Sequence, residues 1–144
     1  MKRILFILCA LCSRSVVADT RITCPDTYPA TLLATKGVPE NWKGVALVPG
    51  PDLALQSAGV IAGLPYKQPQ GIQRGIEKKT KKGLAIEFPA LDAFTEPLEK
   101  WVYCAYGVGG EVQLLQKMPD NTKACKAEFT KTPYGNYSIN MTCS

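Results

Sequence analysis

Two alternating segments near the C-terminus, each containing a cysteine, constrain the fold of this chain more than any other feature. Apolar and polar residues alternate in Cys125–Lys131 and in Tyr137–Cys143, which is typical of β-strands with one buried face. The five residues between them contain a proline and a glycine and predict a hairpin turn. Placing Lys131 opposite Tyr137 makes the two apolar faces coincide and sets three pairs face to face: Ala127 with Met141, Phe129 with Ile139 and Cys125 with Cys143. A slip of one residue would separate the faces, so we predict a Cys125–Cys143 disulfide.

The N-terminus has the pattern of a secretory signal peptide. Met1–Arg3 is positively charged, Ile4–Cys12 is apolar, and small residues precede a cleavage site after Ala18. The apolar run is too short to cross a bilayer, which needs roughly 20 residues, and a buried N-terminal strand or helix fits the pattern less well. We predict a leader over residues 1–18 and a mature domain over residues 19–144, located in the periplasm or, as the alternative, secreted.

Removing this leader changes the charge of the chain. Lys2, Arg3 and Arg14 would leave with it, so 14 basic side chains face 12 acidic ones and the net charge falls from +5 to +2. A nearly neutral protein gives no reason to expect nucleic acid as a partner. The remaining length suits one domain with a single modest core, and no later apolar run is long enough to span a membrane.

Four cysteines remain after cleavage: Cys24, Cys104, Cys125 and Cys143. An even number of cysteines in an exported chain predicts disulfides. Zinc is the alternative, but the chain contains no histidine and the four thiols lack a close C-x-x-C pair. If Cys125 pairs with Cys143, the second bridge is Cys24–Cys104, which would tie the mature N-terminus to a central strand. We therefore expect structural cysteines and no metal.

The rest of the mature chain predicts a mainly β domain. Trp101–Tyr106 is rich in β-forming residues on both faces, which indicates a central strand with Trp101 in the core. Consecutive strands with short turns predict a single small antiparallel sheet or meander, sandwich- or barrel-like, with long Pro/Gly-rich loops and two disulfides. Residues 64–75 read as a polar loop, and residues 94–100 allow one helical turn that Pro97 limits. Further short strands are expected at 21–24, 45–48, 53–56, 59–63, around 76, at 84–88 and at 111–118.

The sequence lacks the residues of the common catalytic systems. Without histidine it has no Ser-His-Asp or Cys-His nucleophile, and it contains no phosphate-binding loop or nucleophile elbow. A pair of carboxylates could still perform hydrolysis. The nearest acidic cluster comprises Glu87, Asp92, Glu96 and Glu99, but its spacing specifies nothing, and solvated surface acids fit it better. We therefore expect no catalytic residues and no cofactor.

A lysine-rich segment, Lys78–Lys82, is the strongest local concentration of charge. Its simpler interpretation is a solvated hairpin turn, and its functional interpretation is a basic contact for an acidic partner or an anionic envelope surface. The Pro/Gly-rich loops are the other candidates, because loops on a rigid sheet commonly carry recognition. The predicted partner contacts are Trp42, Lys43, Tyr66, Arg74, Lys78, Lys79, Lys81 and Lys82.

Several short motifs together resemble a known family. They are Ile22–Pro25, Pro39–Trp42, Trp101–Tyr106, and Pro119 followed by Cys125 and Cys143. The layout is similar to a poorly characterised family of small exported proteins of Gram-negative bacteria, some of them encoded in type VI secretion clusters. The resemblance spans most of the mature chain, but Lys78–Lys82 is not part of the pattern. It implies a periplasmic, non-catalytic protein that binds a toxic effector and plugs its active site with a loop.

Three functions remain open at this point. The leading hypothesis is a periplasmic binding protein that inhibits a cell-envelope-degrading effector enzyme as an immunity protein. The second is a structural or accessory subunit of an envelope secretion system. The third is a carboxylate-dependent hydrolase. In the leading case the partner is a protein, with neither nucleic acid nor a membrane span involved.

Overall fold

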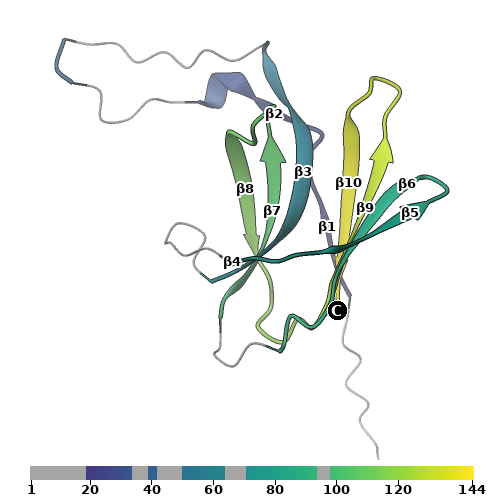
Figure 1. Cartoon of the computed structure of the whole chain (residues 1–144). Helices are drawn as coiled ribbons and strands as arrows, with labels where there is room; N and C mark the ends of the chain where they lie inside the picture. Colours follow the sequence, from purple (N-terminus) through teal and green to yellow (C-terminus); the bar gives the residue numbers. More distant parts are fainter. Residues whose placement is uncertain (1–18, 34–38, 42–49, 64–70, 94–97) are drawn as a thin grey trace, which may run out of the picture.

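Two antiparallel β-sheets face each other in the computed structural model (Figure 1), which describes residues 19–33, 39–41, 50–63, 71–93 and 98–144. The first sheet has the order β1-β10-β9-β6-β5, and its strands are β1 (Thr20–Thr23), β5 (Ile76–Thr80), β6 (Gly83–Phe88), β9 (Cys125–Lys131) and β10 (Tyr137–Cys143). The second sheet has the order β2-β3-β7-β8, and its strands are β2 (Thr27–Pro29), β3 (Asp52–Ala62), β7 (Lys100–Tyr106) and β8 (Val112–Lys117). A two-residue strand β4 (Gly71–Ile72) pairs with the end of β3, and a short 3-10 helix, η1 (Ala30–Leu32), follows β2.

The C-terminal hairpin has the predicted register. Tyr137 lies opposite Lys131, and the pairing continues to Cys143 opposite Cys125. The apolar side chains of both strands therefore point to the same side, where Ala127, Ile139 and Met141 are completely buried. Alternation favoured this pairing, because any odd shift would have turned one apolar face to solvent.

Both predicted disulfides are present. Cys125–Cys143 joins directly opposed residues of neighbouring strands, with Cα atoms 4.1 Å apart. Cys24–Cys104 joins the residue after β1 to the middle of β7, with Cα atoms 5.8 Å apart, and so connects the two sheets. The sulfur of Met118 lies 3.3 Å from Sγ of Cys125 and 3.5 Å from Sγ of Cys143, which buries the hairpin bridge in an apolar environment.

The second sheet is organised around one long strand rather than two short ones. The sequence suggested separate strands at 53–56 and 59–63, but β3 runs without interruption over 11 residues. Its pairing with β7 shifts between Leu55 and Ser57, as in a β-bulge. The extra residue explains the sequence pattern, because Leu53 and Leu55 precede the bulge, Ala58 and Val60 follow it, and all four are buried in the core.

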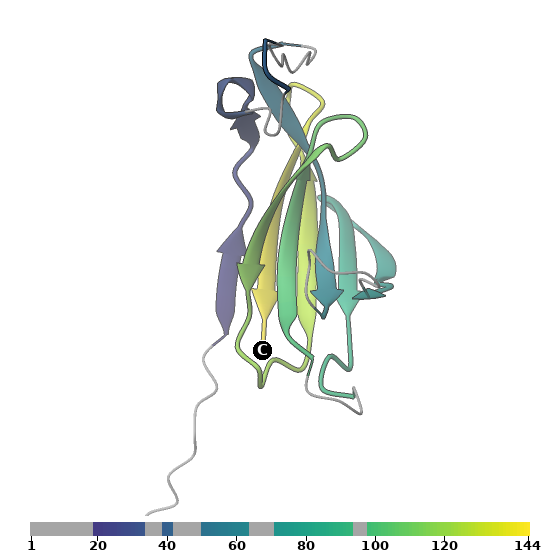
Figure 2. The same cartoon turned by 90° about the vertical axis from the view of Figure 1, so that its left-hand side faces the viewer.

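The core lies between the facing sheets. Figure 2 shows β8, β7 and β3 in front of β10, β9 and β6, and β3 contacts both β9 and β10. Inward side chains of both sheets fill the space, among them Leu55, Val60, Val102, Tyr106, Phe129, Ile139 and Met141. Trp101 was expected in this core, but it lies half-buried on the other face of β7, because Val102, Cys104 and Tyr106 take the inward positions.

The fold class is mainly β and antiparallel, as predicted. The connection from β8 to β9, however, differs from that of a simple meander. These strands belong to different sheets, so the chain crosses between them at residues 118–124. Buried Lys100 holds the crossing, because its Nζ donates hydrogen bonds of 2.8 Å to the carbonyl oxygens of Asp120 and Thr122. Of the predicted helical turn, residues 94–97 lie outside the described residues, and Lys100 begins β7. Residues 1–18 and 45–48 also lie outside them.

No helix among the described residues is long and apolar enough to cross a membrane.

Candidate binding surface

The lysine-rich segment forms a β-hairpin at the edge of the first sheet. Strand β5 pairs with β6 from Ile76 opposite Glu87 to Thr80 opposite Gly83, and every residue of β5 is exposed. Gly83 starts β6 with φ +149°, and a Cβ added there would collide with the carbonyl oxygen of Phe129. Glycine at this position therefore lets the tip of the hairpin lie against β9. The hairpin curves away from the rest of the molecule in Figure 1.

The lysines project from several sides of the hairpin. Lys78 points to the outer face of the sheet, where its Nζ lies 2.6 Å from a carboxylate oxygen of Glu87. Lys79 lies on the opposite face of β5, opposite Leu84, and Lys81 and Lys82 form the turn. No described carboxylate forms an ion pair with Lys79, Lys81 or Lys82. The tip therefore carries three exposed positive charges that the described residues do not neutralise by ion pairing.

A depression of about 400 Å³ lies beside this tip. Its charged residues are Lys81 and Lys82 from the turn and Lys126 and Glu128 from β9. The single carboxylate is already occupied, because Glu128 Oε1 lies 2.7 Å from Nζ of Lys126. The remaining lining residues are Thr80, Leu84, Phe129 and Thr130. The depression is therefore cationic, with an apolar and hydroxyl-bearing wall.

Electrostatic coupling extends across the outer face of the first sheet. The hydrogen bond from Lys126 and its charge lower the pKa of Glu128, and Lys82 and Arg21 lower it further. The same contacts raise the pKa of Lys126, to which Glu87 adds a smaller effect. Glu128 is thus bound by Lys126, and its lowered pKa makes it a poor proton donor.

The structure brings together part of the predicted contact set. Lys78, Lys79, Lys81 and Lys82 share the hairpin, and exposed Arg74 stands between β4 and β5. Trp42, Lys43 and Tyr66 lie outside the described residues. Sequence reasoning missed Lys126 and Glu128, because only the pairing of β9 with β6 places them beside the turn. Their positions on the polar face of β9 gave no signal of this.

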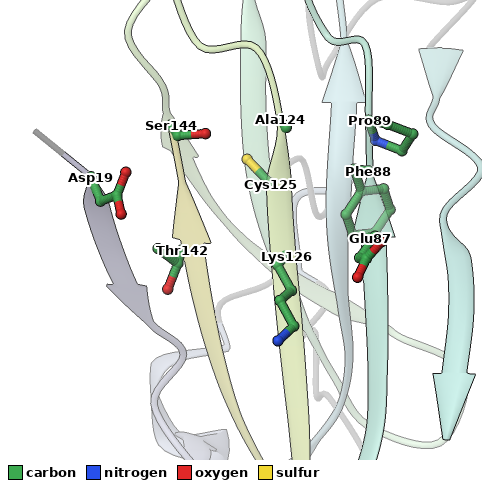
Figure 3. A pocket seen from close by; sticks show the side chains of 9 residues that line it. All are labelled: Asp19, Glu87, Phe88, Pro89, Ala124, Cys125, Lys126, Thr142 and Ser144. Carbon is green, nitrogen blue, oxygen red and sulfur yellow. The ribbon is translucent and has the colours of Figure 1, made fainter. Parts of the chain in front are cut away.

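A second depression, of about 360 Å³, lies at the other end of the same outer face. Figure 3 shows Asp19 beside Ser144, with Glu87 and Lys126 on the neighbouring strands. The apolar and small residues Phe88, Pro89, Ala124, Cys125 and Thr142 complete it. Its two acidic side chains come from opposite sides of the depression, on β6 and before β1, and no closely spaced acid pair of the kind used in hydrolysis is seen there.

The acidic cluster considered for hydrolysis is dispersed. Glu87 lies on the first sheet in its ion pair with Lys78, whereas Glu99 precedes β7 of the second sheet and pairs with Lys117 at 2.7 Å. The hydrogen bond from Lys117 is the main cause that lowers the pKa of Glu99, which suits a surface ion pair and not a general acid. Asp92 is exposed, and Glu96 lies outside the described residues. The described cysteine and acidic residues form no group that could hold a metal ion.

Residues 50–144 match the sequence model of the family described as the type VI secretion system Tli immunity protein. The chain belongs to this family. The matched range contains strands β3 to β10, including the lysine hairpin and the Cys125–Cys143 bridge. No curated protein and no solved structure matches the chain. The predicted resemblance to a family encoded in type VI secretion clusters is confirmed.

Family membership gives the chain an immunity role in type VI secretion and implies an effector protein as its partner. It gives no identity for that effector.

Proposed function

We propose that this protein acts in the periplasm, where it binds a type VI effector enzyme that degrades the cell envelope and blocks it without any catalysis of its own. The family supports the immunity role. The N-terminal leader pattern and the two disulfides support export, because disulfides persist in oxidising compartments. The dispersed, ion-paired carboxylates support binding rather than hydrolysis.

The lysine hairpin and its depression form the proposed contact with the effector. The observation that carries this assignment is the cationic depression, in which Lys81, Lys82 and Lys126 outnumber the one carboxylate of Glu128. Such a surface fits an acidic loop or patch on the partner, and complementary charge mainly accelerates association. Arg74 lies on the connection that leads into the hairpin, and Trp42, Lys43 and Tyr66 are proposed as further contacts.

Binding is tested with the type VI effector encoded beside the gene for this chain. Titration of the purified effector should give saturable binding, and expression of this chain with its leader should protect cells from the effector delivered to the periplasm. A leaderless variant should not protect. Failure of both binding and protection with the cognate effector would contradict the immunity mechanism.

Reversing two charges tests the contact surface. The double variant Lys81→Glu, Lys82→Glu should lower the association rate constant about tenfold at low salt, because long-range attraction is lost. The matched control, Lys123→Glu together with Lys131→Glu, makes the same change in net charge at exposed positions outside the lining of the depression. Equal loss in both double variants would show that net charge, and not the hairpin, governs association. Unchanged association in the hairpin variant would remove this surface from the interface.

A further inference from the structure

Four of the five described outer strands have features that discourage pairing with another chain, and the two-residue strand β4 is one of them. Strand β1 has four residues, β2 has three and ends in Pro29, and β5 carries Lys78 and Lys79 with two more lysines in its turn. Short strands, proline and lysine are the usual means of protecting an edge. Strand β8 has fewer such features, because its six residues contain no proline and a single lysine, Lys117, at the end, and pair with β7 without a register shift.

Strand β8 also exposes leucines. Leu114 and Leu115 remain 37% and 39% exposed, although they point to opposite faces of the sheet. Leu114 lies opposite Cys104 on the core side, and Leu115 lies opposite Tyr103 on the outer side. A strand that no described element covers, with apolar residues on both faces, is a ready template for one more strand.

The alternation of backbone hydrogen bonds along β8 shows which N–H and C=O groups point to its outer edge. The amide of Met118 donates to the carbonyl oxygen of Lys100 at 2.8 Å, on the β7 side. In an antiparallel ladder the groups of successive residues point alternately to the two neighbours. The N–H and C=O groups of Gln113 and Leu115 therefore point away from β7, toward the outer edge of the sheet, where no described strand pairs with β8.

We propose that β8 pairs antiparallel with β8 of a second copy of this chain, with Leu114 on the twofold axis. In this register Gln113 of one copy lies opposite Leu115 of the other, so the outward backbone groups of both strands can exchange hydrogen bonds. The two Leu114 side chains meet on the core side. At each end Glu111 stands opposite Lys117 of the second copy, beside the carboxylate of Glu99 that Lys117 already binds.

The charge pattern of the strand selects this register. A twofold axis perpendicular to the sheet requires paired residues to lie on the same face. The residue numbers of each pair therefore add to one even sum, and successive allowed registers differ by two in that sum. Centring the pair on Leu115 would place Gln113 opposite Lys117 and leave Glu111 beyond the strand end. Only the Leu114-centred arrangement puts unlike charges at both ends. The second copy is therefore the partner that this strand fits by its own sequence.

The expected dimer is weak. A pair of six-residue strands covers less than the roughly 1,200–2,000 Å² of a stable interface, so monomer and dimer should exchange. This association is independent of effector binding, and it can be measured on the purified protein alone.

Sedimentation equilibrium of the parent protein, from about 10 μM to about 1 mM, tests the association. The mean mass should rise toward twice that of the monomer. Leu115→Pro removes an N–H that points to the free edge and should abolish the rise, whereas Leu115→Ala, which keeps that N–H, should retain it at least in part. Thermal unfolding of each variant checks that the fold persists. A constant monomer mass for the parent, or a dimer that persists in Leu115→Pro, would overturn the proposal.

Amide exchange followed by NMR on the unmodified protein provides a second measurement that needs no substitution. The amides of Gln113 and Leu115 should exchange more slowly at high protein concentration, while those of the exposed edge β5 should not change. Concentration-independent exchange at β8 would contradict self-association. Protection that arises only when the effector is added would also overturn the proposal, because the edge would then receive a strand of the effector.

Discussion

At the residue scale, the chemistry of the outer face is that of surface ion pairs. Glu128 is exposed and lies 2.7 Å from Lys126, and the hydrogen bond from that lysine is the main reason for its lowered pKa. The pKa of Glu99 is lowered in the same way, mainly by the hydrogen bond from Lys117.

These pairs predict a small acid sensitivity. A carboxyl whose pKa is lower in the folded protein adds stability above its unfolded value near 4.5, and this contribution is lost as pH falls through the folded pKa. The melting temperature should therefore fall slightly between neutral pH and about pH 3. Glu128→Gln should reduce that slope, and calorimetry across the pH range measures it. An unchanged slope would assign the acid sensitivity to other groups.

At the scale of elements, the lysine hairpin depends on one backbone position. Gly83 combines a positive φ with close contact to β9, so a larger residue must displace either the turn or the neighbouring strand. The same contact holds the lysine tip over the depression formed with β9. The contact at Gly83 therefore affects both the position of the lysine charges and the stability of the hairpin.

Gly83→Ala should destabilise the protein by about 1–3 kcal/mol, as expected for backbone strain together with a steric clash. Urea unfolding gives this difference. Gly135→Ala is the matched control, because Gly135 also has a positive φ, +85°, but has open space around its Cβ position. A loss in Gly83→Ala no larger than in Gly135→Ala would show that the contact with Phe129 is unimportant.

At the scale of the whole molecule, the two disulfides connect different parts of the fold. Cys125–Cys143 closes a separation of 18 residues within one sheet, whereas Cys24–Cys104 closes a separation of 80 residues and joins the two sheets. The longer closed loop restricts the unfolded chain more strongly.

Replacing Cys24 and Cys104 by alanine should therefore cost about 1 kcal/mol more than replacing Cys125 and Cys143, by the loop-entropy relation. Denaturant unfolding of the two double variants compares them directly, with unpaired thiols absent from both. A larger loss for the hairpin variant would indicate that the packing of its bridge against Met118 outweighs chain entropy.

The sequence alone determined the features that depend on neighbouring residues. Alternation in the last two strands gave their register and the Cys125–Cys143 bridge, the remaining cysteines gave the second bridge, and the β-rich segments gave the class. The short motifs also indicated the family that the match over residues 50–144 confirmed. Of the candidate surface, the sequence showed the lysines but not their surroundings.

Only the tertiary structure decided how the strands assemble. The bulge in β3 made one strand look like two in the sequence, because it shifts the period-two pattern by one residue. The crossing after Met118 divided the expected meander into two sheets. The depression beside Lys81 and Lys82 exists because β9 pairs with β6, although the two segments are about 40 residues apart in the chain. Alternation fixes which face of a strand is buried, but the choice of neighbouring strand depends on long-range packing that no local pattern contains.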